Sequence, residues 1–194
     1  MSNSFMLHIC IAYLLGSVSF AVLISKLRSL PDPRSMGSGN PGASNMLRLG
    51  GKPLALATLL GDLGKGALAV WLAQRAGLSP AAQSWVALAA ITGHILPIFH
   101  RLRGGKGVAT AAGALLILSW PAALLTSIIW LATFAALRIA SLASIIACLC
   151  LIPWLAWQRP ELLLACSIMV LLILLRHRLN IGRLLTGSEN HFKN

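Results

Sequence analysis

One uncharged stretch decides how often the chain crosses a membrane: GVATAAGALLILSWPAALLTSIIWLATFAAL, residues 107–137. Its 31 residues contain no Asp, Glu, Lys or Arg. As a single helix it would be about 46 Å long, whereas the hydrocarbon core of a bilayer is about 30 Å thick. Ser119-Trp120-Pro121 lies near the middle, and proline lacks the N–H that a continuing helix needs. The stretch therefore predicts two short helices, not one long helix.

Five further apolar segments complete a predicted all-α membrane protein with seven transmembrane helices. They cover residues 5–27, 54–74, 81–99, 142–157 and 162–175. The last two are only about 21–24 Å long at helical rise, so several of the spans are short. No basic residue precedes the first segment, so we expect it to be retained and not cleaved as a signal peptide. No internal repeat divides the chain, and residues 1–194 are interpreted as one integral membrane domain.

The composition favours a membrane protein over a nucleic-acid-binding one. Apolar residues make up 57% of the chain and charged residues 10%, against about 25% charged residues in a soluble domain. The formal charge is +12, but the cations interrupt apolar runs and form no stripe on a soluble surface. Only four residues are acidic, and no cluster has metal-ligand spacing. We therefore expect no nucleic-acid partner, no metal and no cofactor.

The distribution of Lys and Arg predicts the orientation. Seven spans put thirteen cations on one side, and only Arg75 and Arg159 on the other, with Lys65 inside a span. Because cytoplasmic segments carry the excess of cations, we expect the N-terminus outside and the C-terminus in the cytoplasm. The parity depends on residues 107–137 crossing twice. The thirteen cations are Lys26, Arg28, Arg34, Arg48, Lys52, Arg101, Arg103, Lys106, Arg138, Arg176, Arg178, Arg183 and Lys193.

A long polar loop, predicted over residues 28–53, contains the glycine-rich stretch SMGSGNPGASNMLR at positions 35–48. Glycines allow backbone N–H groups to converge on an anion. A dinucleotide fingerprint is rejected because no strand precedes the glycines, and a P-loop is rejected because Ala43 stands where lysine is required. An ordinary flexible loop is the alternative. The candidate phosphate-binding residues are Ser38, Gly39, Asn40, Asn45 and Arg48.

A second loop, RGGKG at 103–107, precedes the first half of the uncharged stretch. Gly104 and Gly105 can present N–H groups at the start of a helix, where the helix dipole also favours an anion, and Lys106 adds a full charge. The alternative is a basic loop that only sets the topology. Two such loops on one face favour a site for two phosphates, or for one phosphate held firmly.

Three ionisable residues in the apolar segments are expected to support this site. Asp62 and Lys65 are three residues apart on one helix face, so they can form an ion pair, and charges inside a membrane usually face a polar interior. The alternative is direct contact with the ligand. His94 lies near the cytoplasmic end of its segment, close to the 103–107 loop. A structural and a functional role are both open for it.

The final basic segment, RHRLNIGR at 176–183, combines simple membrane-interface cations with less usual residues. Snorkelling of long side chains explains Arg176 and Arg178. It does not explain His177 and Asn180, which share a helical face and are candidates for a ligand-binding or catalytic role. Ser141 follows the short turn at Arg138, and hydrogen bonding is expected of it because no base is adjacent in the sequence.

Taken together, four motifs resemble the bacterial acyl-phosphate:glycerol-3-phosphate acyltransferases, the PlsY family. They are GSGNPGASNMLR at 37–48, GHILP at 93–97, RGGKGVAT at 103–110 and RHRLNIGRL at 176–184. Ser44 stands where the family usually has threonine, and Ala140 where relatives often have a second serine. The positions that match the family's site residues are Ser38, Gly39, Asn40, Arg48, Lys106, Ser141, His177 and Asn180.

The resemblance implies a seven-helix enzyme of the bacterial inner membrane with its active site at the cytoplasmic face. It implies transfer of a fatty acyl group from acyl phosphate to the 1-hydroxyl of glycerol 3-phosphate. Lysophosphatidate and inorganic phosphate would be the products. The expected partners are these substrates, membrane lipids and the enzyme that produces acyl phosphate.

The residue types fit direct transfer, because an acyl phosphate is already activated and both substrates carry phosphate. The site must neutralise charge and align the hydroxyl with the carbonyl. Either His177 or the substrate's own phosphate can take the hydroxyl proton. A carrier for a phosphorylated metabolite is a competing class, but carriers often contain internal repeats. A lipid-headgroup-binding structural protein is a third class, for which the glycine-rich loops have no use.

Overall fold

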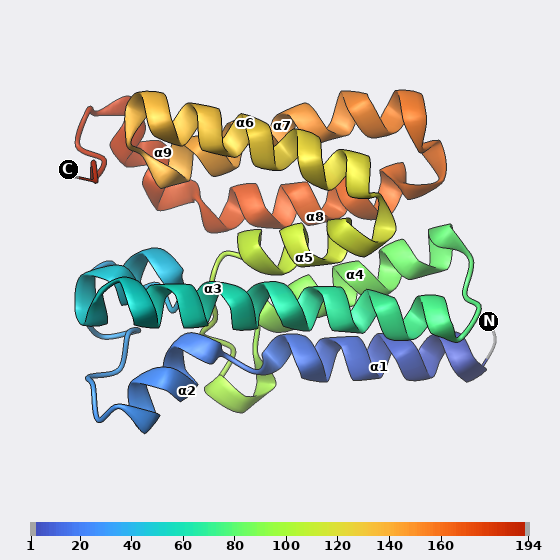
Figure 1. The fold of residues 1–194 in the computed structure, drawn as a ribbon, viewed down its shortest axis with the longest axis horizontal. Coiled ribbons are helices and arrows are strands. Elements are labelled where there is room, and N and C mark those ends of the chain that lie inside the picture. Colours follow the sequence, from blue (N-terminus) through green and yellow to red (C-terminus); the bar gives the residue numbers. More distant parts are fainter. Residues whose placement is uncertain (1–2, 193–194) are drawn as a thin grey trace.

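The computed structural model describes residues 3–192, and these are helical with no strand among them (Figure 1). Lys193, one of the thirteen cations assigned to the cytoplasmic side, lies outside the described residues. The helices are α1 (Asn3–Ser17), α2 (Phe20–Leu27), α3 (Ala43–Arg75), α4 (Pro80–Ile95), η1 (Ile98–His100), α5 (Val108–Leu118), α6 (Trp120–Leu137), α7 (Ala140–Gln158), η2 (Pro160–Leu162), α8 (Leu163–Arg176) and α9 (Arg178–Leu185).

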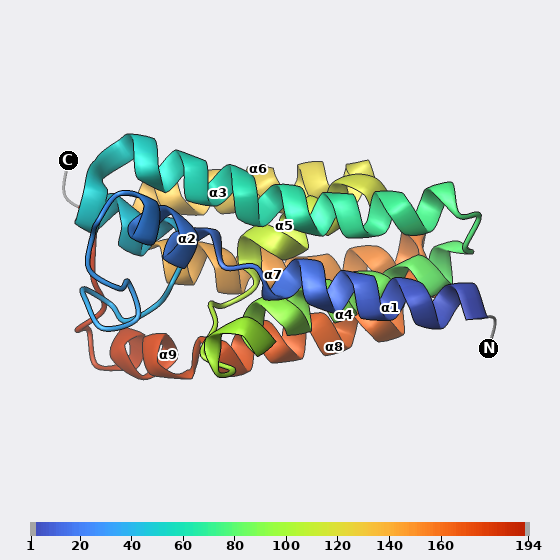
Figure 2. The same cartoon turned by 90° about the horizontal axis from the view of Figure 1, so that it is seen from below.

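The helices lie side by side along one long axis, and the two termini are at opposite ends of it (Figures 1 and 2). Helices α1 to α5 form one group and α6 to α9 the other, with α5 next to the second group in Figure 1. The start of α3, the loop before it and α9 gather at the C-terminal end. The polar motifs of the sequence are therefore brought to one end of the bundle.

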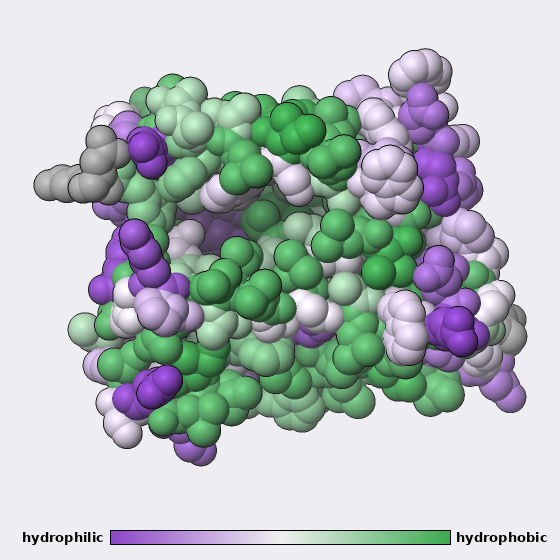
Figure 3. Space-filling view, in the orientation of Figure 1, coloured by the Kyte–Doolittle hydropathy of each residue, from purple (hydrophilic) through white to green (hydrophobic). Residues whose placement is uncertain are grey.

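On the face shown in Figure 3, apolar residues form a broad band across the middle of the molecule, and hydrophilic residues gather toward both ends. Helices α3, α4, α6 and α7 are each long and apolar enough to cross a membrane, α4 being counted with η1. Two bent pairs, α1 with α2 and η2–α8 with α9, would each qualify as a broken span. Residues 3–192 thus contain four to six candidate spans by length and composition, and α5 is a shorter apolar helix.

The predicted break in residues 107–137 is confirmed. Helix α5 ends at Leu118 and α6 begins at Trp120, with Ser119 in an extended conformation between them. Pro121 lies in the first turn of α6, where its missing N–H has no intrahelical partner to lose. The same proline that could not continue α5 therefore starts α6.

The predicted loop over 28–53 is wrong in its second half, because α3 begins at Ala43. Residues 43–49 are helix-compatible, and the chain kinks at Gly51, whose φ of 78° is accessible to glycine. Pro53 follows within the first turn after this kink, a position that tolerates proline. Because glycine and proline usually form loops, the sequence did not predict the short helix that ends at the kink.

Three other boundaries differ from those expected. The first segment bends by 42° between α1 and α2, and Lys65 Nζ donates to the carbonyl of Val18 at the break, 2.6 Å away. Helix α4 ends at Ile95 instead of residue 99, because the residue before Pro97 cannot easily stay helical. Residues after 175 continue as α9, bent by 59° from α8.

Small residues allow the helices of the first group to pack closely. A Cβ added at Gly113 of α5 would lie 1.9 Å from the carbonyl oxygen of Leu63 in α3. One added at Gly66 of α3 would lie 2.1 Å from the carbonyl oxygen of Thr110 in α5. Such close backbone approach is a usual way to join helices in a membrane, where the hydrophobic effect does not drive them together. This contact fixes the start of α5 against α3.

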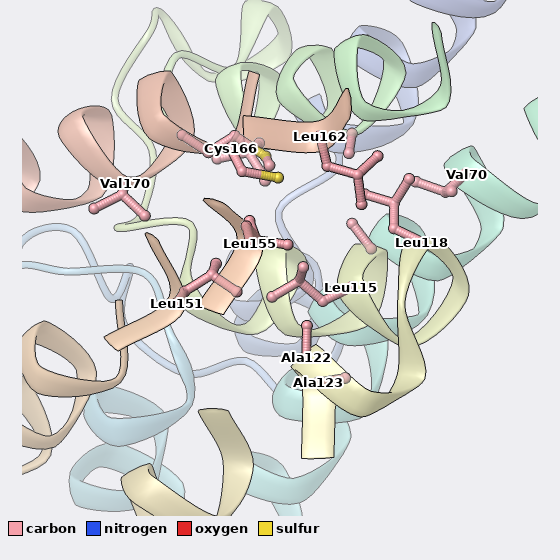
Figure 4. Close-up of a cluster of buried hydrophobic side chains, with 14 of the residues drawn as sticks. Val70, Leu115, Leu118, Ala122, Ala123, Leu151, Leu155, Leu162, Cys166 and Val170 are labelled. Carbon is pink, nitrogen blue, oxygen red and sulfur yellow. The ribbon is translucent and has the colours of Figure 1, made fainter. Parts of the chain in front are cut away.

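The main hydrophobic core lies toward the end of the bundle away from the polar motifs. Leu118, Leu155, Leu162 and Cys166 meet there, from α5, α7, η2 and α8 (Figure 4). All four are 5% exposed or less. The core joins the two groups of helices at one end and leaves a space between them at the other.

Candidate active site

A cavity of about 590 Å³ lies between the two groups of helices, and the face in Figure 3 is hollowed there. Its wall is polar toward the C-terminal end of the bundle and apolar toward the core. All eight residues that match the PlsY-family positions line it: Ser38, Gly39, Asn40, Arg48, Lys106, Ser141, His177 and Asn180. The structure therefore brings together positions up to 142 residues apart in the sequence (180 − 38).

Lys106 lies at the centre of the polar end, two residues before α5 begins. Its Nζ donates to Asn180 Oδ1, 2.5 Å away, which connects the 103–107 loop to α9. Burial lowers the pKa of Lys106 to about 8; Glu189 opposes this shift, and Arg183 adds to it. Lys106 is therefore a partly buried cation that is largely charged at neutral pH. The first residues of α5 line the same wall, where the helix N-terminus favours an anion.

Glu189 is the residue of this site that the sequence did not single out. Its side chain is 7% exposed, and Oε1 accepts from Asn180 Nδ2 at 2.6 Å and from Ser141 Oγ at 2.9 Å. Arg183 Nε donates to Oε2 at 2.7 Å. Burial raises the pKa of Glu189, but these three hydrogen bonds outweigh it and hold the pKa below its usual range. The carboxylate thus fixes α9 against the start of α7.

The glycine-rich stretch lines the cavity with Ser38, Gly39 and Asn40, and two of its N–H groups are used inside the loop. The N–H of Ser38 donates to Asn45 Oδ1, and the N–H of Gly39 to the carbonyl of Met36. These two amides therefore hold the shape of the loop, and the binding of an anion by other N–H groups of the stretch stays a prediction. The side chains of Ser38 and Asn40 line the cavity, and within residues 3–192 neither has a protein hydrogen-bond partner.

Asn45 does not line the cavity, although the sequence placed it among the phosphate-binding candidates. It is 1% exposed, and its Nδ2 donates to the carbonyls of Pro33 at 2.8 Å and Met36 at 3.0 Å. Its Oδ1 is occupied by Ser38. All of its amide groups are thus used within the loop, and it shapes the wall that carries Ser38 and Asn40.

Gly104 and Gly105 also lie behind the cavity wall. The N–H of Gly105 donates to the carbonyl of His94, and Arg176 donates to the carbonyls of Gly104 at 2.8 Å and Gly105 at 3.1 Å. The expected role of Gly105 as an N–H donor to a phosphate is therefore wrong. Snorkelling does not account for Arg176, which attaches the end of α8 to this loop.

The predicted pair of Asp62 and Lys65 is confirmed as an ion pair with an N···O distance of 2.9 Å. Both side chains are 3% exposed. His94 Nδ1 lies 3.6 Å from the same carboxylate oxygen, and its ring fills the space where a Cβ of Gly105 would stand. Asp62 and His94 reach the cavity wall. This trio connects α3 and α4 beneath the 103–107 loop.

His177 lies between α8 and α9 and is 1% exposed. Its Nδ1 is 2.8 Å from the carbonyl oxygen of Ile173, so Nδ1 carries the proton and Nε2 is left as an acceptor. Burial, together with the charge of Lys106, lowers the pKa of His177 to about 4. The imidazole is therefore neutral at physiological pH and can accept a hydrogen bond.

The apolar part of the cavity continues from these polar groups toward the core. Helices α5, α7 and α8 supply its walls, and Trp130 of α6 donates from Nε1 to Ser144 Oγ at 3.0 Å. Its apolar lining residues are Ala111, Ala112, Leu115, Leu131, Ala147, Cys148, Leu151, Met169, Val170 and Ile173. An apolar chain fits this part, with its head group among the cations.

The described helices and the cavity define a helical membrane protein with a site that joins a cationic end to an apolar end. Comparison with known proteins makes this specific. Residues 6–187 match the glycerol-3-phosphate acyltransferase family model. The chain belongs to this family, and it is accordingly a membrane acyltransferase.

Two curated relatives, both called glycerol-3-phosphate acyltransferase, cover almost the whole chain. The one from Pseudomonas putida is 54% identical over 188 residues, which is 97% of this chain and 100% of the relative. The one from Pseudomonas fluorescens is 58% identical over 181 residues, which is 93% of this chain and 96% of the relative. The family assignment therefore extends over the length of both proteins.

Two solved structures of PlsY (YgiH), described as an integral membrane glycerol 3-phosphate acyltransferase, have the same fold. The glycerol 3-phosphate form has a TM-score of 0.93 at 38% identity, covering 98% of this chain and 96% of that one. The lysophosphatidic acid form has a TM-score of 0.90 at 36% identity, with the same coverage. The chain therefore shares both the sequence family and the architecture of PlsY.

Proposed function

We propose that this acyltransferase moves a fatty acyl group from acyl phosphate to the 1-hydroxyl of sn-glycerol 3-phosphate. The products are lysophosphatidate and inorganic phosphate, and the reaction is the first acylation of phospholipid synthesis. One observation carries the proposal: the cation-rich end and the apolar end belong to the same cavity. An acyl phosphate has this combination of a charged head and an apolar chain.

Each of the two substrate phosphates is assigned its own cation. Lys106, from the loop before α5, and Arg48, from α3, both line the cavity, and we assign each a phosphate. Ser38 and Asn40 add hydrogen-bonding side chains on the Arg48 side. Gly39 allows the loop backbone to stay close to the ligand, and the start of α5 adds the helix dipole beside Lys106.

Asn180, Ser141 and Glu189 keep this arrangement fixed. Asn180 accepts from Lys106 and donates to Glu189, so one amide sets the position of both groups. We assign Asp62, Lys65 and His94 a supporting role beneath the 103–107 loop, and Asn45, Gly104 and Gly105 a role in shaping the two loops. A site held by buried hydrogen bonds loses little free energy to reorganisation when the reaction's charge develops.

The chemical step is direct attack of the hydroxyl oxygen on the acyl carbonyl carbon. A C–O bond forms to glycerol 3-phosphate, and the C–O bond to the phosphate breaks with its electron pair leaving on the phosphate. Neutral His177 orients the hydroxyl by accepting its hydrogen bond at Nε2. With a pKa of about 4 His177 is a weak base and does not keep the proton. As the C–O bond forms, the hydroxyl turns its proton from His177 to the departing phosphate, which accepts it.

A covalent acyl-enzyme is not part of this route. The hydroxyl of Ser141 donates to Glu189 at 2.9 Å, and the pKa of that carboxyl group is lowered, which makes it a poor base for activating a nucleophile. Recovery of an acylated serine or cysteine after quenching during turnover would overturn direct attack.

The same proposal includes the placement in the membrane. Seven crossings put α5 across the membrane as a short span of about 16 Å, with the N-terminus outside and the cavity's polar end at the cytoplasmic face of the bacterial inner membrane. Glycerol 3-phosphate then reaches the site from the cytoplasm. The donor arrives through the lipid or from the enzyme that produces acyl phosphate.

Purified protein in detergent or lipid tests the reaction. It is incubated with labelled glycerol 3-phosphate and either acyl phosphate or acyl-coenzyme A, and lysophosphatidate and phosphate are measured. We expect product from acyl phosphate alone. Product from acyl-coenzyme A alone would refute the donor, and product from neither would refute the proposed function.

A further inference from the structure

The end of the described chain lines the cavity with Glu189, Asn190 and Phe192, beyond the match to the family model, which ends at residue 187. Glu189 is held by Arg183, Asn180 and Ser141. Three residues later the N–H of Phe192 donates to the carbonyl of Arg138 at 2.9 Å. Residues 188–192, the C-terminal strap, are therefore fastened at both ends to α9 and to the α6–α7 turn.

Phe192 occupies a defined place between the two groups of helices. Its ring packs edge-on against Phe134 of α6, with ring centroids 5.5 Å apart and planes at 71°. On its other side the guanidinium carbon of Arg48, from α3, lies 5.1 Å from the ring centroid. This distance is within the range of a cation–π interaction. Phe192 thus connects α3 to α6 at the wall of the cavity.

The contact with Phe192 leaves the N–H donors of the Arg48 guanidinium available to a ligand. A planar guanidinium stacks through its face, whereas its N–H donors point outward along its edge. Within residues 3–192 no protein acceptor is bonded to the Arg48 guanidinium, and the residue lines the cavity. Without the ring, the long side chain would have many alternative rotamers, and each binding event would have to select one.

We propose that Phe192 is a positioning residue for the acyltransferase reaction: its ring holds Arg48 with the N–H edge facing the cavity, where a substrate phosphate binds. The inference rests on the proposed function, because it takes Arg48 as a phosphate-binding group. It adds that Phe192 belongs to the substrate site, although it lies beyond residue 187, where the match to the family model ends.

Kinetics of Phe192→Ala and Phe192→Trp, each compared with wild type, test this role. We expect Phe192→Ala to raise KM for glycerol 3-phosphate or for acyl phosphate about two- to fivefold, the factor that an exposed cation–π contact supplies, while kcat stays unchanged. Phe192→Trp keeps an aromatic face and should restore KM. His191→Ala, at an exposed neighbouring position, is the matched control and should behave as wild type.

A double substitution separates this inference from the proposed function. Arg48→Ala alone should raise KM, and adding Phe192→Ala to it should have no further effect, because the ring acts through Arg48. If Arg48→Ala raises KM and Phe192→Ala does not, the positioning role is wrong and the phosphate assignment stands. A lower KM for Phe192→Ala would show that the ring keeps Arg48 away from the substrate, which also overturns the inference. If Arg48→Ala is unchanged, the assignment of a phosphate to Arg48 fails.

Discussion

Raising the pH above 8 should remove the charge of Lys106 and with it much of the enzyme's efficiency. Burial lowers the pKa of this residue from 10.5 to about 8, so the side chain is mostly protonated at pH 7. One pH unit above the pKa, at pH 9, only about one tenth of the molecules keep the charge. Because kcat/KM reports ionisation of the free enzyme, it should fall roughly tenfold between pH 7 and pH 9.

Rising pH changes the contribution of Lys106 to folding stability in the opposite direction to its effect on kcat/KM. A loss of activity can therefore be distinguished from a loss of stability. Its pKa is lower in the folded protein than in the unfolded chain, so the unfolded chain binds more protons between pH 8 and 10.5. The contribution of Lys106 to folding stability therefore rises with pH in this window. A fall in kcat/KM there cannot be assigned to unfolding caused by this residue.

The assay is a series of initial rates at limiting substrate from pH 6 to pH 10, for wild type, Lys106→Arg and Lys106→Ala. Arginine stays charged throughout this range, so Lys106→Arg should show no fall near pH 8, whatever its absolute rate. Lys106→Ala should be slow at every pH. A wild-type profile that stays flat to pH 9, or the same fall in Lys106→Arg, would refute the assignment.

Two further predictions concern packing. Gly113→Leu should lower the free energy of unfolding by about 1–3 kcal/mol, because its Cβ would lie 1.9 Å from the carbonyl oxygen of Leu63. The loss should be seen as a lower Tm in detergent. Gly64→Ala is the control, because the added Cβ has no neighbour within 4 Å. Ala147→Phe should fill the apolar part of the cavity and reduce kcat/KM for long acyl donors at least tenfold more than for short ones. Leu149→Phe, at a position exposed on α7, should leave this ratio unchanged, and equal losses for long and short donors would contradict the placement of the acyl chain.

The apolar pattern predicted the helices well because a membrane leaves few alternatives to a helix. The break at Ser119 was predictable for the same reason, since 31 uncharged residues exceed one span. The start of α3 was not, because two glycines and Pro53 suggest a loop. In the structure Gly51 forms a kink between two helical parts, and whether glycine ends or only bends a helix depends on tertiary contacts.

Site residues could be predicted from the sequence where no structural role explained the residue type. Lys106, His177 and Asn180 stood out in the sequence, and all three line the cavity. Asn45 has the same chemistry as Asn40, but its amide is used by the loop backbone. Such competition between local and ligand contacts is invisible in a single sequence.

The sequence did not identify Glu189 and Phe192 as site residues, because their roles depend on where the C-terminal strap folds back. The chain has only four acidic residues, and one acid near a basic segment is the signal that could have identified Glu189. An isolated phenylalanine in a polar tail carries no comparable signal, and its contact with Arg48 is purely tertiary.

The central claim, that one cavity holds both substrates, is tested most directly by a structure of this chain with glycerol 3-phosphate and a non-hydrolysable acyl phosphonate. Both phosphorus-bearing groups should lie within hydrogen-bond distance of Arg48 or Lys106. The acyl chain should lie between α5, α7 and α8, beside Ala147. Binding of either head group at the exposed cations Arg101 and Arg103, or an acyl chain on the outer surface of the bundle, would contradict it.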